Sequence, residues 1–399
     1  MDVARVRQDF PVLQQEDVVY LDSACQSLRP RQVVAAMDAY YLEYPACGGR
    51  SVHRLASRVA IAVDEARETA ASFVHFPEPN GVVFTKNCTE ALNLVAQGIA
   101  FRKGDVVLTS DIEHNSNNVP WIMLQPRGVK RRVVRTPDDG MHDLERWKEA
   151  IRRDVRLVSV AQTNNVVGST LPLKEICELA HDVGAEVLVD GAQSVPHMPV
   201  DLQGIGADYL AFSSHKMLGP SGVGLLIAYP GKLDKLRPLI TGGGSVISAT
   251  NDSAEFLPVP EKLEAGLLNY AGIVGTRAAM DYLKHLGMEA VSEHDTMLNR
   301  EATALLQDER VQILAPQQPE ARSGILSFNV HGLRSHDVAM FLDEMGGIML
   351  RSGMHCAHPY FETHGIDGCA RASFYIYNTK EDCRRLSVAV MKLADSFSR

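Results

Sequence analysis

The sequence is poor in cysteine, with seven among 399 residues, and no two of them form a C-x-x-C pair. A disulfide scaffold needs a dense, even set of cysteines, and a structural zinc site needs ligands in close pairs. The spacing therefore argues against both, and no metal site is predicted. Most of the cysteines are expected to be small buried apolar residues, with Cys356 as the exception.

Positive charge is also in short supply, because 40 Lys and Arg stand against 49 Asp and Glu, a net charge of −9. Binding to nucleic acid or an anionic membrane needs a cationic face, so neither partner is expected. The longest apolar runs, such as 223–229, are too short to span a bilayer, and residues 1–7 lack the apolar core of a signal peptide. A soluble, cytoplasmic protein is expected.

What the sequence has is a regular alternation of short apolar runs with amphipathic stretches of helical length, such as 90–99. Continuous apolar strands separated by helices are typical of a mostly parallel sheet covered on both faces. The pattern predicts an α/β fold with a doubly wound, seven-stranded sheet. The expected strands are 82–84, 105–108, 130–134, 157–160, 186–189, 207–212 and 224–227.

After Gly287 the spacing of apolar runs changes, which predicts a smaller α+β unit. Its expected strands are 311–314, 325–330, 348–350 and 371–375, and its expected helices are 336–345 and 380–397. The predicted division is an N-terminal segment, 1–20, that packs with the small domain, a large domain, 21–280, and a small C-terminal domain, 281–399. Within the large domain, 231–265 is rich in Gly, Pro and Ser, and Thr241–Ser245 is expected to be a flexible or ligand-contacting loop.

Polar residues follow the predicted strands of the large sheet, at the edge where such sheets bind ligands. Each has an ordinary explanation alone: Asp caps turns, His occupies loops, and Lys is solvated. Together they match the needs of pyridoxal phosphate (PLP), which are an amine, a carboxylate for the ring nitrogen, a donor for the phenolic oxygen, a phosphate cradle and a flat group over the ring. The matching residues are Lys216 as amine, Asp190 as carboxylate, Gln193 as donor, Thr89, Ser213 and His215 for phosphate, and His114 for stacking.

The ordered motifs resemble those of class V aminotransferase-like enzymes of PLP fold type I, over nearly the whole chain. They are Leu21–Ala24, Cys88–Asn93, Glu113–Asn117, Asp190–Gln193, Ser213–Lys216, Gly219–Gly224, Glu264–Gly266, Arg351–Ala357, Arg371–Ser373 and Tyr377–Thr379. The Arg351 and Arg371 blocks are similar to those of the SUF-type (group II) cysteine desulfurases and selenocysteine lyases.

The resemblance implies roles for individual residues. Lys216 would hold PLP and move the α-proton, and Cys88 would be a small spacer in the cofactor site beside Thr89. Arg371, assisted by Asn165, would bind the substrate carboxylate through its bidentate fork. His53 would lie near the substrate in its own or a neighbouring subunit, or simply begin a helix.

The same resemblance makes Cys356 the catalytic thiol. Its expected cationic neighbours are His355, His358 and the substrate-site residue Arg351, and positive charge favours the thiolate, which is the nucleophile. Attack on the sulfur of L-cysteine would leave a persulfide on Cys356 and release L-alanine. The sulfur would then pass to an acceptor or scaffold protein of iron–sulfur cluster assembly, and the enzyme would be a homodimer.

The chain departs from the family pattern at Asn115, at Met354, after Ala357 and in the segment 267–270, where Tyr270 stands in place of a phosphate-binding Thr. These departures leave alternatives open: a selenocysteine lyase, a cysteine C–S lyase, or an aminotransferase or epimerase. An α/β protein without PLP chemistry, such as a sulfur-carrier or scaffold module, is a further alternative. A nicotinamide-dependent enzyme is not expected, because no G-x-G-x-x-G motif follows a predicted strand.

Overall fold

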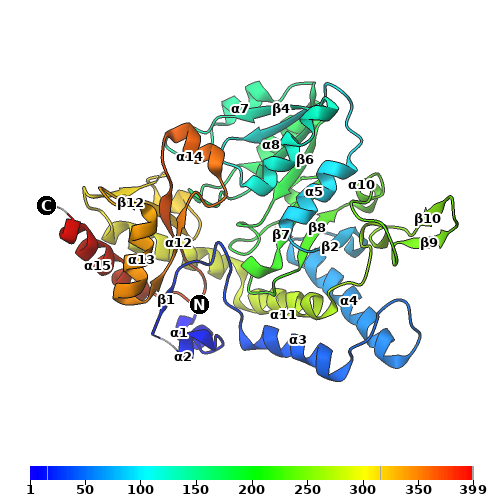
Figure 1. The fold of residues 1–399 in the computed structure, drawn as a ribbon, viewed down its shortest axis with the longest axis horizontal. Coiled ribbons are helices and arrows are strands. Elements are labelled where there is room, and N and C mark those ends of the chain that lie inside the picture. Colours follow the sequence, from blue (N-terminus) through cyan, green and yellow to red (C-terminus); the bar gives the residue numbers. More distant parts are fainter. Residues whose placement is uncertain (16, 315, 398–399) are drawn as a thin grey trace.

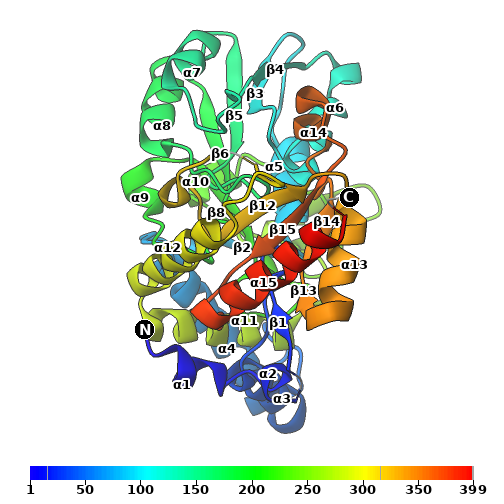
Figure 2. The same ribbon diagram turned by 90° about the vertical axis from the view of Figure 1, so that its left-hand side faces the viewer.

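The computed structural model describes residues 1–15, 17–314 and 316–397. A large central sheet and a smaller sheet are each flanked by helices (Figure 1). Seen from the side, the C-terminal helix α15 (Lys380–Phe397) crosses in front of the small sheet (Figure 2). Among the described residues, no helix combines the length and the apolar character needed to cross a membrane.

The large sheet has seven strands in the order β2-β8-β7-β6-β5-β3-β4, and only β8 runs antiparallel to its neighbours. The predicted doubly wound, mostly parallel sheet is therefore confirmed, with strand bounds within two residues of the expected ones. The strands are β2 (Val82–Thr85), β3 (Val106–Ser110), β4 (Lys130–Val134), β5 (Val155–Ala161), β6 (Glu186–Asp190), β7 (Tyr209–Ser213) and β8 (Gly224–Ala228).

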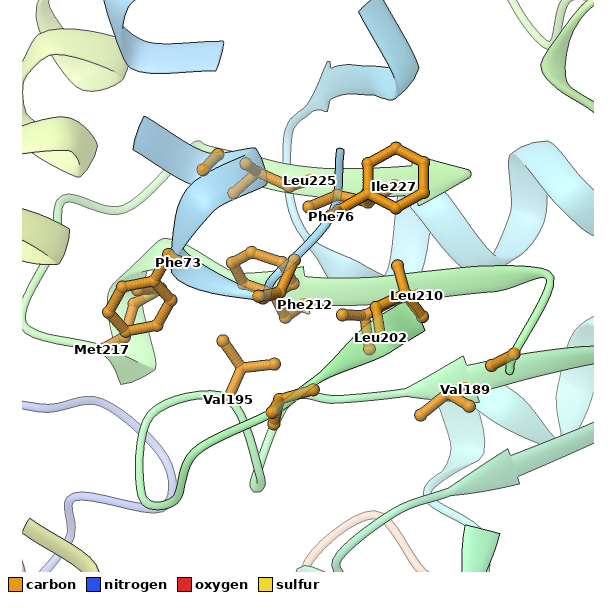
Figure 3. Packing of buried hydrophobic residues seen from close by; sticks show 14 of the residues in the cluster. Phe73, Phe76, Val189, Val195, Leu202, Leu210, Phe212, Met217, Leu225 and Ile227 are labelled. Atoms are coloured by element: carbon orange, nitrogen blue, oxygen red, sulfur yellow. The ribbon is translucent and has the colours of Figure 1, made fainter. Parts of the chain in front are cut away.

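Both faces of this sheet are covered, which explains why its strands are continuously apolar rather than alternating. One face carries Val189, Leu210 and Phe212, which pack against Phe73 and Phe76 at the end of a long helix (Figure 3). That face is covered by α4 (Arg54–Phe73), α7 (Leu144–Ala150), α8 (Leu173–Asp182) and α11 (Tyr270–Leu286). The other face is covered by α5 (Cys88–Gly98), α6 (Val119–Ile122) and α10 (Pro230–Leu233). Each large apolar side chain buried here contributes about 1.5–3 kcal/mol.

The second sheet is antiparallel, with strand order β11-β12-β15-β14, and forms its own apolar cluster with three helices. Its strands are β11 (Val311–Ile313), β12 (Ile325–Val330), β15 (Cys369–Ser373) and β14 (Arg351–Gly353), and its helices are α12 (Met288–Leu305), α13 (Ser335–Gly346) and α15. The strand predicted over 348–350 forms only in part and does not belong to this sheet. Only β13 (Ile348–Met349) forms, and it pairs with β1 (Val19–Tyr20), outside this sheet.

The N-terminal segment joins several parts of the chain. It comprises α1 (Val3–Arg7), α2 (Val12–Gln15) and β1, whose parallel pairing with β13 ties it to the second unit. The Arg7 guanidinium donates to the Tyr377 carbonyl at 2.6 Å. Phe10 packs edge-on against both Tyr282, in α11, and Tyr377. The segment therefore contacts the large unit as well as the small one.

Several further elements lie outside the two sheets. The expected loop 241–245 forms no helix or strand, and it is followed by a hairpin of β9 (Val246–Ala249) and β10 (Ala254–Phe256) that projects from the molecule (Figure 1). An early helix, α3 (Arg31–Glu43), packs along α11, and α14 (His358–His364) follows β14.

Candidate active site

A cavity of about 220 Å³ opens at the carboxyl ends of β5, β6 and β7 and at the start of α5. Parallel strands bring the residues after their carboxyl ends to one edge of a sheet, which is why residues distant in sequence meet here. All but two of the predicted site residues line this cavity, and the two outside its lining are Cys356 and His53.

Lys216 ends a 3₁₀ turn (Ser214–Lys216) that follows β7. Two residues later Leu218 has φ of +66°, so the chain turns sharply just beyond the lysine. Among the described residues the Lys216 ammonium has no hydrogen-bond or ion-pair partner. Burial lowers the pKa of Lys216, with Asp190 acting in the opposite direction. A lowered pKa increases the fraction of neutral amine, the form that attacks a carbonyl.

Asp190 ends β6, and only 5% of its surface is exposed. Its Oδ1 accepts from the Ala192 N–H at 2.9 Å and from the Cys88 thiol at 3.3 Å. Burial raises the pKa of Asp190, while the Ala192 N–H and Lys216 lower it. Burial, and then Asp190, raise the pKa of Cys88 well above its usual value, so this thiol keeps its proton. Cys88 is therefore a hydrogen-bond donor to the carboxylate rather than the spacer that was predicted.

The start of α5 forms one end of the cavity. Asn87 caps this 11-residue helix by accepting from the Glu90 N–H at 2.9 Å. The Ser213 hydroxyl accepts from the Cys88 N–H at 2.8 Å, and the Thr89 and Ser116 hydroxyls are 2.7 Å apart. The β8 backbone passes so close that a Cβ on Gly224 would lie 2.3 Å from the Asn87 carbonyl carbon. Hydroxyls thus gather at a helix N-terminus, the usual setting for a phosphate.

His215 and His114 are both neutral at physiological pH. Burial, reinforced by Lys216, lowers the pKa of His215 to about 4 and that of His114 to about 3. The His114 Nδ1 accepts from the Ser116 N–H at 3.1 Å, which fixes the ring at the cavity wall. An uncharged, oriented imidazole is suited to stacking on a flat ligand.

The buried Glu113 holds the loop that carries His114. Its carboxylate accepts from the Ser110 hydroxyl at 2.6 Å, the Asn117 amide at 2.7 Å and the Ala161 N–H at 2.9 Å. Burial raises the pKa of Glu113 to about 7, against these three donors. Glu113 therefore links the end of β3 to the end of β5.

Arg371 lies in β15, with 1% of its surface exposed, and reaches the cavity from the small sheet. It donates to the Asn165 carbonyl at 2.8 Å and pairs with Asp22 at 3.4 Å. Its Nε has no partner among the described residues. The Asn165 amide donates to the His355 carbonyl at 2.8 Å, so its side chain anchors the cysteine loop.

Cys356 lies in the loop between β14 and α14, partly exposed. His355 and Cys356 have φ of +46° and +57°, a conformation that non-glycine residues rarely adopt, and two in succession indicate a strained loop. The Asn115 N–H donates to the Cys356 carbonyl at 2.6 Å, and Ala357 packs in a small apolar cluster with Val166. Asn115, which departs from the family pattern, thus contacts the cysteine loop directly.

The charge around Cys356 differs from the expectation. Arg351 donates to its sulfur at 3.7 Å. His355 is buried, its Nε2 bonds to the Cys369 carbonyl at 3.0 Å, and burial, with Arg371, lowers its pKa to about 2. His355 is therefore neutral and supplies no positive charge. The His358 ring lies 2.9 Å from the Asn115 amide.

His53 and Tyr270 lie outside this cavity. His53 is exposed and caps α4, its Nδ1 accepting from the Ala56 N–H at 3.3 Å, which is the helix-start alternative considered above. The Tyr270 hydroxyl donates to the Gly48 carbonyl at 3.2 Å and lines a separate cavity of about 530 Å³. Gly244, from the expected ligand-contacting loop 241–245, lines that second cavity as well, and no residue of this loop lines the first.

Cys25 is the residue that the sequence reasoning missed. It was grouped with the packing cysteines, but it is partly exposed, lines the cavity and accepts from Arg351 at 3.2 Å. Its position directly after the recognised motif Leu21–Ala24 was the available signal. Asn87 and Ser116 also line the cavity unpredicted.

Residues 19–386 match the aminotransferase class-V family, and the chain belongs to that family. It is 41% identical to a probable cysteine desulfurase of Methanothermobacter thermautotrophicus, over 98% of this chain and 97% of the relative. It is 38% identical to a cysteine desulfurase of Dickeya dadantii, over 98% and 96%. The apo structure of a cysteine desulfurase from Thermococcus onnurineus NA1 superposes with a TM-score of 0.95 at 36% identity, covering 99% of this chain and 98% of that one. Family membership decides against an unrelated sulfur-carrier or scaffold module.

Proposed function

We propose that this protein is a PLP-dependent cysteine desulfurase, which converts L-cysteine to L-alanine and holds the removed sulfur as a persulfide on Cys356. The proposal is carried by one observation: Arg351 both lines the cavity of the unpartnered Lys216 and donates to the Cys356 sulfur. A buried amine and a partly exposed thiol are thereby joined at one cavity, as a sulfur-removing enzyme of this family requires.

The residues present fit PLP. The cavity offers an amine without a partner, a buried carboxylate, and hydroxyls at a helix N-terminus. Three buried polar atoms of residues that line it also lack partners among the described residues: Gln193 Oε1, His355 Nδ1 and Arg371 Nε. Unpartnered buried polar atoms are rare and indicate a ligand. When bound, PLP supplies an electron sink that acidifies the α-hydrogen of an attached amino acid.

Each residue then has a distinct task. Lys216 holds the cofactor, and Asp190 holds a proton on the ring nitrogen by charge pairing. The Cys88 thiol and the Ala192 N–H keep that carboxylate oriented. Gln193 would bind the phenolic oxygen, His114 would stack on the ring, and Thr89, Ser213 and His215 would hold the phosphate.

Arg371 is the substrate anchor. Its guanidinium is buried and fixed by the Asn165 carbonyl, it pairs with Asp22, and its Nε has no partner in the described part of the chain. A bidentate contact to a carboxylate orients an amino acid as well as binding it. Lys216, in the turn after β7, then removes and returns the α-proton. Asn165 contributes by holding both Arg371 and the cysteine loop.

Cys356 carries out the sulfur step. Its thiolate attacks the sulfur of the substrate, a new S–S bond forms, and the C–S bond of the substrate breaks. The electron pair left on carbon takes up a proton to give alanine, and the sulfur remains on Cys356 as a persulfide. Arg351 stabilises the thiolate before attack by its positive charge at 3.7 Å.

The assembly, location and partners are also part of the proposal. Leu42, with 83% of its surface exposed, and the exposed Tyr41, Val52, Ile247 and Leu267 support a homodimer that buries them. The exposed His53 then serves the neighbouring subunit's site. A cytoplasmic sulfur-acceptor or scaffold protein of iron–sulfur cluster assembly takes the sulfur. The division at 1–20, 21–280 and 281–399 accords with the separate apolar cluster around the small sheet.

The test is incubation with L-cysteine, followed by measurement of the amino-acid product and of protein-bound sulfur. Alanine plus a persulfide on the Cys356 peptide is expected, and Cys356→Ser should abolish both while leaving PLP bound. Cys47→Ser is the matched control, because Cys47 is also partly exposed but lies outside the cavity. Pyruvate with free sulfide would indicate a C–S lyase. Turnover of selenocysteine but not of cysteine would indicate a selenocysteine lyase. Amino-group exchange with a keto acid that Cys356→Ser leaves unchanged would indicate an aminotransferase.

A further inference from the structure

Two cysteines share one arginine at the mouth of the cavity. Arg351 donates through Nη1 to the Cys25 sulfur at 3.2 Å and through Nη2 to the Cys356 sulfur at 3.7 Å. Two distant parts of the chain meet here, since Cys25 follows β1, whereas Arg351 begins β14 and Cys356 lies in the loop after it. A single planar guanidinium therefore brings the two thiols into one neighbourhood.

The Cys25 backbone is held firmly in this position. Its N–H donates to the Asp22 carbonyl at 3.0 Å. The preceding residue, Ala24, donates to the Ser373 hydroxyl at 3.0 Å and accepts from the Gln193 amide at 2.8 Å. These contacts fix Cys25 to β15 and to the loop after β6, so its sulfur is a built part of the cavity wall.

The electrostatics agree with this arrangement. Burial lowers the pKa of Arg351, whereas the neighbouring Cys25 and Cys356 sulfurs and the Asp22 carboxylate raise it, and the net shift is upward. Each thiolate is thus a favourable partner for the same cation. The two differ in access, because Cys25 lines the cavity and Cys356 lies on the strained loop outside its lining.

We propose that Cys25 is a second sulfur-carrying thiol, which receives the persulfide sulfur from Cys356. The inference rests on the proposed desulfurase activity, which supplies that persulfide. The Cys25 thiolate attacks the outer sulfur of the Cys356 persulfide, a new S–S bond forms on Cys25, and the S–S bond on Cys356 breaks. The products are a Cys25 persulfide and a Cys356 thiolate, so no external oxidant or reductant is needed. Arg351 compensates the negative charge on whichever sulfur carries it.

The consequence is a capacity of two sulfurs per subunit. Transfer to Cys25 frees Cys356 for a second substrate while the first sulfur stays on the protein. Without an acceptor, the holoenzyme should therefore release two alanines per subunit in a rapid burst. Removal of Cys25 should halve that burst.

The first experiment locates the sulfur. The holoenzyme is incubated with L-cysteine without acceptor or reductant, alkylated, digested and analysed by mass spectrometry, in parallel with Cys25→Ser, Cys25→Ala, Cys356→Ser and the control Cys47→Ser. Persulfide is expected on both peptides in the wild type and in Cys47→Ser, on Cys356 alone in the two Cys25 variants, and on neither in Cys356→Ser.

The second experiment needs no turnover. A short bifunctional alkylating agent, dibromobimane, is added to the protein without substrate, and a cross-linked Cys25–Cys356 peptide pair is expected in the wild type and in Cys47→Ser only. Absence of the cross-link would contradict the shared position of the two thiols.

Three results of the first experiment would overturn the relay. They are a Cys25 that never carries sulfur although Cys356 does, a Cys25–Cys356 disulfide with release of sulfide, and a persulfide on Cys25 in Cys356→Ser. Failure of the proposed function looks different, because neither alanine nor a Cys356 persulfide would form at all.

Discussion

The two sides of the cavity are built differently. On one side, Lys216 and Asp190 stand at the ends of β7 and β6, within a sheet that is packed on both faces. On the other, Cys356 lies on a loop with two successive left-handed residues, held by Asn115 and Asn165 from the large sheet. The comparison indicates that cofactor-binding groups are placed by regular structure, whereas the reactive sulfur is placed by a few hydrogen bonds.

The largest expected effect is on the strand-end side. Lys216→Ala removes the amine that holds the cofactor and moves the proton, so alanine formation should fall about 10³-fold or more. The absorption of the lysine-bound cofactor should vanish, measured on the purified protein after addition of PLP. Lys148→Ala, on the exposed face of α7, should leave both unchanged. Retained absorption in Lys216→Ala would show that another amine holds the cofactor.

A second prediction concerns stability on the same side. The pKa of Glu113 is raised in the folded protein to about 7, so the folded state binds a proton more tightly than the unfolded state does. The Glu113 contribution should therefore lower the free energy of unfolding as pH rises from about 4.5 to about 7. The expected decline is about 3 kcal/mol, since one pKa unit corresponds to about 1.4 kcal/mol.

The measurement is denaturant unfolding of the wild type and Glu113→Gln across this range. The variant does not titrate, so the difference between the two curves should change in the stated direction and flatten above pH 7. A difference that stays constant with pH would contradict a buried, titrating Glu113.

The smallest effect is expected on the loop side. Asn165→Ala removes the donor to the His355 carbonyl but keeps the backbone carbonyl that fixes Arg371. Loss of one neutral hydrogen bond costs about 0.5–1.5 kcal/mol, which corresponds to a fall of about 2- to 12-fold in the rate of persulfide formation. Cofactor absorption should not change. Asn93→Ala, an amide on α5 outside the cavity, is the control. An equal loss of cofactor binding and persulfide formation would contradict the separation of the two sides.

Much of this architecture follows from local pattern. The seven strands of the large sheet were predictable because burial on both faces makes each strand apolar throughout, and the polar residues after them mark the ligand-binding edge. The strand over 348–350 was predicted and β13 forms within it, but its pairing with β1 and the separate strand β14 were not predictable, since a run of two or three residues has no periodicity to detect. The partners of β13 come from residues 19–20, more than 300 positions earlier.

The charge states around the thiols show the same limit. His355 next to Cys356 suggested a cation, but burial against the Cys369 carbonyl keeps it neutral. Cys88 was predicted to be a small spacer, but its thiol donates a hydrogen bond to the Asp190 carboxylate. Both outcomes depend on desolvation, which is a property of the folded surroundings and not of neighbours in sequence.

The sequence by itself determined the large sheet, its ligand-binding edge and the set of groups that suits PLP, because apolar periodicity and the residues after each strand are local properties. Only the tertiary structure decided that Cys25 lines the cavity and shares Arg351 with Cys356. Residues 25, 351 and 356 meet because β1 pairs with β13 and the segment after β1 bonds to β15, and such long-range pairing is set by the packing of the whole chain.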